Sequence, residues 1–221
     1  MKQTFRILRF LIIALLCGII VITYLYLRHP DDRRLPDRYG ETIPAYISPG
    51  DMDQDGLDDQ SDILASALAY LSTRPAYKSA YYAGGYPDDN YGVCTDVIAF
   101  ALKGAGYDLS ALVDQDIADH AEEYADEVRD AAVDFRRVRN LKIFFAHNAK
   151  PLTTDLRDIA AWQGGDIVIF DDHIGIVSDR RNKDGVPYLI HHASVFQQHY
   201  EEDVLAKRND LVAHYRFPKS D

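Results

Sequence analysis

The chain has 221 residues, 47% of them hydrophobic, and its 24 basic and 35 acidic side chains give a formal net charge of −11. This length suits one membrane segment and one compact domain, and it excludes a second large domain. Residues 1–34 hold 6 of the basic and 2 of the acidic side chains, so the rest of the chain has a net charge of −15. Because nucleic acid and anionic lipid both bind positive surfaces, we expect neither to be a partner of this acidic body.

The first predicted element is a membrane helix over residues 8–28, after a short cytoplasmic tail of residues 1–7. Its apolar run carries a single charge, Arg9, and about 20 such residues span a hydrocarbon layer as a helix. A cleaved signal peptide is the alternative, but the run ends without a small-residue cleavage pattern, which favours an uncleaved anchor. Basic residues flank both ends, so charge alone does not decide the orientation. A short amino-terminal tail usually stays in the cytoplasm, and we therefore expect the body outside, in the periplasm or at the cell surface.

Residues 29–50 hold four prolines and many charges, which predict a tether between the anchor and the domain. The domain itself is predicted over residues 61–221.

An acidic loop over residues 51–62, DMDQDGLDDQSD, leads into this domain. Its spacing matches a twelve-residue calcium loop, with glycine at the sharp-turn position 6 and a backbone carbonyl at position 7. The predicted ligands are Asp51, Asp53, Asp55, the Leu57 carbonyl, Asp59 and Asp62. The loop departs from the EF-hand pattern, because position 12 is aspartate, position 8 is not aliphatic and no helix leads in. It resembles more closely the calcium loops of dockerins and thrombospondin-type repeats.

We expect a structural calcium ion in this loop, with a dissociation constant of about 10⁻⁴ to 10⁻³ M. Six aspartates in twelve residues would repel one another without a cation. The ion would join the tether to the first helix and would not touch Cys94. The alternative is an acidic linker in which Asp59 or Ser61 only caps the helix.

Hydrophobic periodicity predicts helices over residues 61–71 and 95–103 and mostly helical structure over residues 108–134. The stretch 141–146, LKIFFA, suits either a helix or a strand. The segments GDIVIF, HIGIVSD and VPYLIHHAS predict three antiparallel strands, and LVAHYRF predicts a last one. Helices followed by a strand meander indicate an α+β domain.

The chain has two cysteines, and Cys17 lies in the predicted span, so Cys94 has no disulfide partner in the body. A free cysteine is often only a small buried hydrophobe. Outside the cell, however, an unpaired thiol is prone to oxidation, which favours a chemical role. Cys94 stands where a helix begins, and the helix amino terminus is expected to lower its pKa.

A cysteine nucleophile needs an imidazole within hydrogen-bond reach and a third group to orient that imidazole. His173 opens the second strand of the meander, and His191 and His192 lie on the next strand. Neighbouring strands are about 4.8 Å apart, so one of this pair can reach His173. The two point to opposite faces, so only one can serve. The competing interpretation is a zinc site formed by Cys94, His173 and His191.

The motifs GVCTDVI, WQGGDIVIF, HIGIVSDR, LIHH and HYRF together resemble a bacterial family of domains of unknown function, DUF1287, over roughly residues 61–217. That family is in turn similar to the NlpC-type branch of papain-like cysteine peptidases. The resemblance implies a papain-like α+β fold in which a helix-borne cysteine packs on an antiparallel sheet. It also implies that Cys94 is the nucleophile, that His173 is the base, and that the third residue comes from the following strand, with His191 slightly favoured over His192.

Other side chains are candidates for substrate binding. Asp96 either contacts substrate or caps the helix that Cys94 begins. Arg136 and Arg137, in the family-like stretch DFRRVRNL, either hold a substrate carboxylate or pair with the acidic helix before them. Tyr82 either lines a cleft near Cys94 or packs in the interior.

The function that these features predict is a membrane-anchored cysteine hydrolase that cleaves amide bonds, with peptidoglycan peptides as the expected substrate. No metal is expected in the chemical step. The alternative is a non-catalytic, calcium-stabilised module that binds wall peptides or a protein partner. Acyl transfer on lipid is a third possibility, which the acidic body disfavours.

Overall fold

The structure is a computed structural model and describes residues 2–27, 29–124 and 128–219. Residue 28 of the predicted anchor, residues 125–127 of the acidic stretch and residues 220–221 of the predicted domain lie outside the described residues. The helices are α1 (Lys2–Leu27), α2 (Asp59–Ser72), α3 (Cys94–Gly104), α4 (Leu109–Asp119), α5 (Ala131–Asp134) and α6 (Val138–Asn148), with 3-10 turns at Ala121–Glu123, Ile159–Ala161 and Leu205–Lys207. The strands are β1 (Ala76–Tyr77), β2 (Tyr91–Gly92), β3 (Lys150–Pro151), β4 (Ile167–Phe170), β5 (Ile174–Arg181), β6 (Pro187–Ile190), β7 (Glu201–Glu202) and β8 (Leu211–Arg216).

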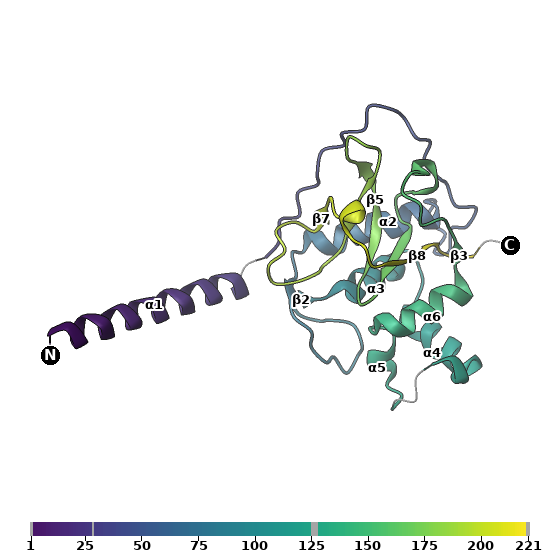
Figure 1. The fold of residues 1–221 in the computed structure, drawn as a ribbon. Helices are drawn as coiled ribbons and strands as arrows, with labels where there is room; N and C mark the ends of the chain where they lie inside the picture. Colours follow the sequence, from purple (N-terminus) through teal and green to yellow (C-terminus); the bar gives the residue numbers. More distant parts are fainter. Residues whose placement is uncertain (1, 28, 125–127, 220–221) are drawn as a thin grey trace.

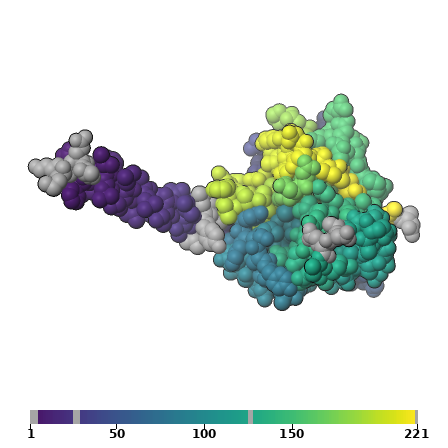
Figure 2. Space-filling model, turned by 60° about the horizontal axis from the view of Figure 1, so that its bottom comes forward, coloured from purple at the N-terminus to yellow at the C-terminus, as the bar shows by residue number. Residues whose placement is uncertain are grey.

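Helix α1 stands clear of the rest of the molecule (Figures 1 and 2). Its segment Phe5–Tyr24 is long and apolar enough to cross a membrane, and none of it is buried in the protein. A signal sequence would have the same length and composition. The predicted apolar helix at the amino terminus is therefore confirmed.

Helices α2 and α3 pack against each other and against β5 (Figure 1). The three apolar residues of α2 that share one face, Ile63, Ala67 and Leu71, are all buried. The four apolar residues predicted to share one side of α3, Val97, Ile98, Ala101 and Leu102, are also buried. Both helices thus form where the spacing of apolar residues predicts them, because that spacing places one face against the sheet.

Helices α4, α5 and α6 lie together on the opposite side of α3 from most of the sheet (Figure 1). The ambiguous stretch LKIFFA belongs to α6. Its buried residues Leu141, Phe144 and Phe145 follow a spacing of three and four, which is helical. Of the helix and the strand that the sequence allowed here, the structure has the helix.

Six strands form one antiparallel sheet in the order β3-β8-β4-β5-β6-β7. The predicted meander corresponds to β4, β5 and β6, with Val168 opposite Gly175 and Ile176 opposite Ile190. The last strand, β8, inserts between β3 and β4, with His214 opposite Val168. Helices and an antiparallel sheet share one main core, so the predicted α+β class is confirmed.

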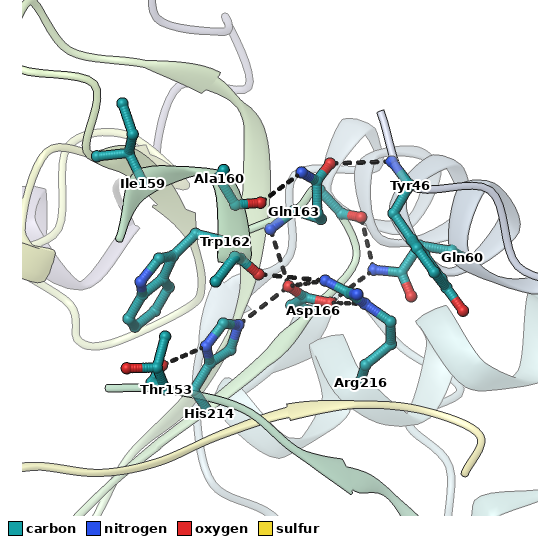
Figure 3. A network of polar contacts seen from close by, with 12 residues as sticks. Tyr46, Gln60, Thr153, Ile159, Ala160, Trp162, Gln163, Asp166, His214 and Arg216 are labelled. Carbon is teal, nitrogen blue, oxygen red and sulfur yellow. Dashed lines mark hydrogen bonds and ion pairs between the residues drawn. The ribbon is translucent and has the colours of Figure 1, made fainter. Parts of the chain in front are cut away.

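The motifs WQGGD and HYRF meet in a buried polar network at one end of the sheet (Figure 3). Asp166, which is fully buried, accepts hydrogen bonds from Gln60 Nε2 at 2.9 Å, His214 Nε2 at 3.0 Å and Arg216 Nε at 2.8 Å. Gly165 has a positive φ of +89°, and a Cβ there would lie 2.4 Å from the Gln60 carbonyl, so only glycine fits. These side chains join α2, β4 and β8 and are structural.

The segment 29–50, predicted to be a tether, lies on the surface of the domain. Arg34 Nη2 bonds Glu201 Oε1 at 2.7 Å, the Arg38 N–H donates to the carbonyl of Arg181 at 2.8 Å, and the Tyr46 N–H donates to Gln163 at 3.0 Å. The proline-rich stretch is thus held to β5 and β7 by hydrogen bonds that no short-range pattern in the sequence shows.

Candidate active site

Cys94 is the first residue of α3, as its position in the sequence predicts. Val93 is the N-cap in an extended conformation, and the Asp96 carboxylate accepts a hydrogen bond from its N–H at 2.9 Å. The backbone N–H groups of Ile174, the first residue of β5, and of Thr95 act on the Cys94 thiol and lower its pKa. The thiol is therefore held between the start of a helix and the start of the strand that follows His173.

The pKa of Cys94 departs from the expectation for a helix amino terminus. Burial of the thiol raises its pKa to about 11, and the negative charge of Asp96 acts in the same direction. The backbone N–H donors of Ile174 and Thr95 lower the pKa, but by less than burial raises it. The substrate-free site therefore holds a neutral thiol rather than a thiolate.

His173 is presented by the two-residue turn between β4 and β5. The turn is closed by a 2.8 Å hydrogen bond from the Phe170 N–H to the His173 carbonyl. The imidazole Nε2 lies 2.7 Å from Nδ1 of His191, and the two rings meet edge to face with centroids 5.0 Å apart. Burial, with the neighbouring His191, lowers the pKa of His173 to about 3, so the imidazole is neutral.

The other ring nitrogen of His173, Nδ1, has no hydrogen-bond partner among the described residues. No hydrogen bond joins it to Cys94 there. Such hydrogen bonds are often long before substrate binds and shorten only in the complex. Nδ1 is thus the nitrogen left for the thiol.

Of the two adjacent histidines, His191 is the one that meets His173. Its Nε2 lies 3.1 Å from Oε2 of Glu202 on the neighbouring strand β7. His192 points elsewhere, and its ring packs edge-on against Tyr77 and Tyr200, each with centroids 5.2 Å away. Both ring nitrogens of His192 are buried without a hydrogen-bond partner in the described part of the chain.

The structure adds residues that the sequence did not single out. Glu202 accepts from His191, and Gln197 Nε2 donates to the His191 carbonyl at 3.1 Å. Burial raises the pKa of Tyr77, and the neighbouring Cys94 and Asp172 act in the same direction. No short-range signal marks Glu202, because its role depends on the pairing of Glu202 with Leu189 across two strands.

Asp96 and Arg136, both predicted to bind substrate, bind each other. Arg136 Nε and Nη2 lie 2.7 and 3.0 Å from the two oxygens of Asp96, and Nη1 donates to the Ala80 carbonyl at 2.7 Å. The Asp96 side chain is 0% exposed and that of Arg136 is 6% exposed. Asp96 thus caps α3, which is one of its two predicted roles, and its carboxylate pairs with Arg136. Contact of either side chain with substrate stays a prediction.

The remaining two substrate-binding candidates also have partners within the protein. Tyr82 is buried under the Arg136 guanidinium, 5.1 Å from the ring centroid, and donates its hydroxyl to Asp89 at 2.8 Å. Arg137 pairs with Asp134 at 2.7 Å. For Tyr82 the structure favours packing in the interior over lining a cleft. For Arg137 it favours pairing with the acidic segment over holding a substrate carboxylate.

A surface hollow of about 280 Å³ adjoins the site. Its lining consists of Ser79, Ala80, Tyr81, Val93, Val133 and Arg136. Val93 directly precedes Cys94, so the hollow adjoins the residue that begins α3.

The zinc interpretation is disfavoured by the contacts of the two histidines. The facing nitrogens of His173 and His191 are 2.7 Å apart and hydrogen-bond each other, and the second nitrogen of His191 faces Glu202. Among the described residues, two groups of side chains have ligand atoms close enough for one ion, and neither includes Cys94.

One of these groups lies in the acidic loop. Carboxylate oxygens of Asp51, Asp53 and Asp55 lie within 4.8 Å of one another, and Gly56 has the positive φ of +96° that a sharp turn requires. The two oxygens of Asp59 accept hydrogen bonds from the Met52 N–H of the same loop at 2.8 Å and from the Tyr107 hydroxyl at 2.9 Å. Asp59 is not one of the three residues whose ligand atoms lie together, and its role as a calcium ligand stays a prediction. The cap of α2 is Asp58, not Asp59 or Ser61.

The fold and the site together define an α+β domain with a partly buried thiol at a helix start and two imidazoles, from the start and the end of adjacent strands, that hydrogen-bond each other. Residues 64–217 match the family described as Domain of unknown function (DUF1287), and the chain belongs to this family. It is 38% identical over 152 residues to a protein of Escherichia coli (strain K12) described as "Uncharacterized protein YijF", covering 65% of this chain and 72% of that protein. No solved structure matches the chain.

Proposed function

We propose that the protein is a papain-like cysteine hydrolase of the NlpC type that cleaves amide bonds, with Cys94 as nucleophile, His173 as base and His191 as the orienting residue. The observation that carries the proposal is the linked set of side chains behind the thiol. Cys94 begins α3, which packs against β5, and His173 immediately precedes the first residue of β5. Nδ1 of His191 lies 2.7 Å from Nε2 of His173. Each position along this path has the chemistry that amide hydrolysis requires.

The reaction begins from the neutral thiol and the neutral imidazole. As the Cys94 sulfur bonds to the substrate carbonyl carbon, its proton passes to Nδ1 of His173. The carbonyl oxygen becomes an oxyanion, which backbone N–H groups at the start of α3 stabilise. His173 then gives the proton to the leaving amine as the C–N bond breaks. Water hydrolyses the resulting thioester and restores both groups.

Glu202 is a positioning residue in this scheme. It accepts from Nε2–H of His191, which leaves a lone pair on Nδ1 of the neutral ring. That lone pair accepts from Nε2–H of His173, so Nδ1 of His173 has the lone pair that takes the thiol proton. The negative charge of Glu202 also stabilises the single positive charge that the two imidazoles carry after proton transfer. Neither His191 nor Glu202 touches the substrate.

The proposed substrate is a peptide of the cell wall, reached from the membrane through α1. The support is the apolar helix at the amino terminus, which is long enough to cross a membrane, and the acidic composition of the body. The proposal takes the body to lie outside the cytoplasm. Peptidoglycan offers amide bonds at that location, and the hollow beside Val93 has room for one side chain of a peptide.

A binding module without catalysis is the second candidate. The observation in its favour is the burial that keeps the Cys94 thiol protonated, with a pKa of about 11. An inert thiol is enough for a protein that only holds a wall peptide.

Digestion of purified peptidoglycan separates the two candidates. The full chain in detergent micelles is expected to release fragments with new amino groups, each cleavage adding the mass of one water. Cys94→Ala and His173→Ala are expected to abolish the release, while Cys17→Ala, which removes the other cysteine, retains it. Binding of peptidoglycan without cleavage, equal in the Cys94→Ala chain, would refute the hydrolase and support the binding module.

A further inference from the structure

Two histidines and a buried aspartate meet where α4 and α6 end, outside the site around Cys94. Asp116 and His120 lie one turn apart at the carboxyl end of α4, and His147 is in the last turn of α6, which packs against α4 (Figure 1). The side chain of Asp116 is 6% exposed, and those of His120 and His147 are 41% and 22% exposed. One carboxylate oxygen and one nitrogen of each ring lie within 4.8 Å of one another. The cluster is thus set into the surface and is open to solvent on one side.

The contacts of His147 leave one place that a neutral ring cannot fill. Its Nδ1 lies 2.9 Å from Oδ2 of Asp116, and its Nε2 lies 3.2 Å from Oε2 of Glu123. A neutral imidazole has a single N–H, so it donates to only one of these two carboxylates. When the N–H on Nε2 donates to Glu123, the lone pair of Nδ1 faces the Asp116 carboxylate. Two such acceptors repel each other at this distance unless a proton or a metal ion lies between them.

The surroundings of Asp116 favour a metal ion over a proton. The buried carboxylates of Asp96 and Asp166 each pair with an arginine, whereas in the described part of the chain the basic side chains that pair with Asp116 are only His120 and His147. The ring centroids of the two histidines are 4.3 Å apart, and Nδ1 of His120 lies 3.5 Å from Oδ1 of Asp116. Two protonated imidazoles this close would repel each other, but one metal ion would bind both neutral rings and balance the carboxylate.

We propose that Asp116, His120 and His147 form a binding site for a divalent transition-metal ion, with zinc as the ion that fits best. Zinc binds imidazole nitrogen and carboxylate oxygen at about 2.0 to 2.2 Å, so ligand atoms in its tetrahedron lie about 3.3 Å apart. The distances of 2.9 and 3.5 Å between Asp116 oxygens and the two rings bracket this value, and the exposed ring of His120 only has to rotate toward the ion. Calcium and magnesium prefer oxygen ligands, which two imidazoles do not supply.

Neighbouring side chains would orient the ligands. Glu123 accepts from Nε2–H of His147, which leaves Nδ1 for the ion, and this pairing of a carboxylate with a metal-bound histidine is common in zinc sites. The Tyr124 hydroxyl and Nδ2 of Asn148 both donate to the Asp116 carboxylate, the latter at 2.9 Å. Three protein ligands leave the fourth position to water. The ion would fasten the carboxyl ends of α4 and α6 to each other, where both helix dipoles favour a cation.

The test is zinc binding and thermal unfolding of the full chain in detergent micelles, after a chelator has been added and removed. In equilibrium dialysis against zinc chloride, His147→Gln is expected to bind one zinc ion fewer per chain than the unmodified protein. The unfolding midpoint of the unmodified protein is expected to rise by about 5 to 10 °C when free zinc is about 100-fold above the dissociation constant. His120→Gln and His147→Gln are each expected to lose this rise, and magnesium chloride is expected to give none.

Two control variants separate this site from the other candidate ligands. Cys94→Ala removes the thiol, Asp53→Asn removes one carboxylate of the acidic loop, and both are expected to keep the rise with zinc. His120 and His147 are partly exposed, so their variants are expected to fold, and their unfolding midpoints without zinc check this. The proposal is overturned if the unmodified chain shows no rise, if either histidine variant keeps it, or if either control variant loses it. Peptidoglycan cleavage plays no part in these measurements, so they stand apart from the test of the hydrolase.

Discussion

At the scale of single residues, burial dominates the chemistry of the site. The helix start favours a thiolate at Cys94, yet removal of the thiol from water raises its pKa to about 11. Burial also lowers the pKa of His173 to about 3. Both shifts favour the uncharged form, because a partly desolvated charge is more costly than a neutral group. Proton transfer therefore accompanies attack instead of preceding it.

The pH dependence of peptide cleavage follows from these two values. His173 accepts a proton only when neutral, so activity is expected to fall on the acid side well below pH 6.5, the ordinary histidine value, toward the lowered pKa of about 3. The thiol loses its proton only near pH 11, so the profile of kcat/KM is expected to be flat across neutral pH. Measurement of kcat/KM against pH checks this. An acid limb centred near 6.5 would contradict it and would indicate a solvated His173.

Glu202 is expected to act on the rate through His191. Glu202→Gln removes the negative charge that stabilises the positive charge on the two imidazoles, so kcat should fall by about tenfold while KM stays unchanged. The matched control is Glu123→Gln, since Glu123 also accepts from an imidazole, Nε2 of His147 at 3.2 Å, on another part of the surface. Steady-state kinetics on a soluble wall peptide separates kcat from KM. A rise in KM at constant kcat would contradict the positioning role.

At the scale of elements, the pair formed by Asp96 and Arg136 joins α3 to the turn before α6. Asp96 accepts from the Val93 N–H as well, so one buried carboxylate both caps the helix that presents Cys94 and receives the guanidinium. The sequence places these residues 40 positions apart, and the bond between them orients the wall of the hollow beside Val93.

Loss of Arg136 should therefore destabilise the fold. Arg136→Met leaves the Asp96 charge buried without its partner, and the free energy of unfolding is expected to fall by about 3 kcal/mol. Denaturant unfolding followed by circular dichroism measures this. Arg157→Met, which removes an exposed arginine paired with Asp155, is the control and should leave stability unchanged. An Arg136→Met chain as stable as the unmodified one would show that the pair has no structural role.

At the scale of the whole molecule, the buried histidines make the free energy of unfolding depend on pH. Burial lowers the pKa of both His173 and His192 to about 3, below the value of 6.5 for an unfolded chain. The unfolded state then binds more protons below pH 6.5, so the stability is fully present above that pH and is lost as the pH falls toward 3. Each histidine contributes a slope of up to about 1.4 kcal/mol per pH unit.

The His192→Phe variant tests this linkage. Its free energy of unfolding is expected to fall less steeply than that of the unmodified chain between pH 6.5 and about pH 4. Asp62 also titrates in this range, because burial and neighbouring aspartates raise its pKa to about 6, and its effect on stability has the opposite sign. Since Asp62 is present in both chains, the difference between the two slopes reports on His192. Peptide cleavage should persist in His192→Phe, since His191 is the residue that meets His173. Equal slopes in the two chains would contradict the prediction.

By itself, the sequence determined those parts of the protein that depend on local periodicity and residue type. The apolar helix, the helices that carry Ile63 and Val97, the strand meander and the position of Cys94 at a helix start all follow from spacing and turn residues, which act within one element. Only the tertiary structure decided what depends on contacts between distant elements. It brought His191 rather than His192 to His173, placed Glu202 beside His191, paired Asp96 with Arg136 and bonded Asp59 to Tyr107. The direction of the Cys94 pKa belongs to this second group, because desolvation depends on what covers the thiol and not on its neighbours in the chain.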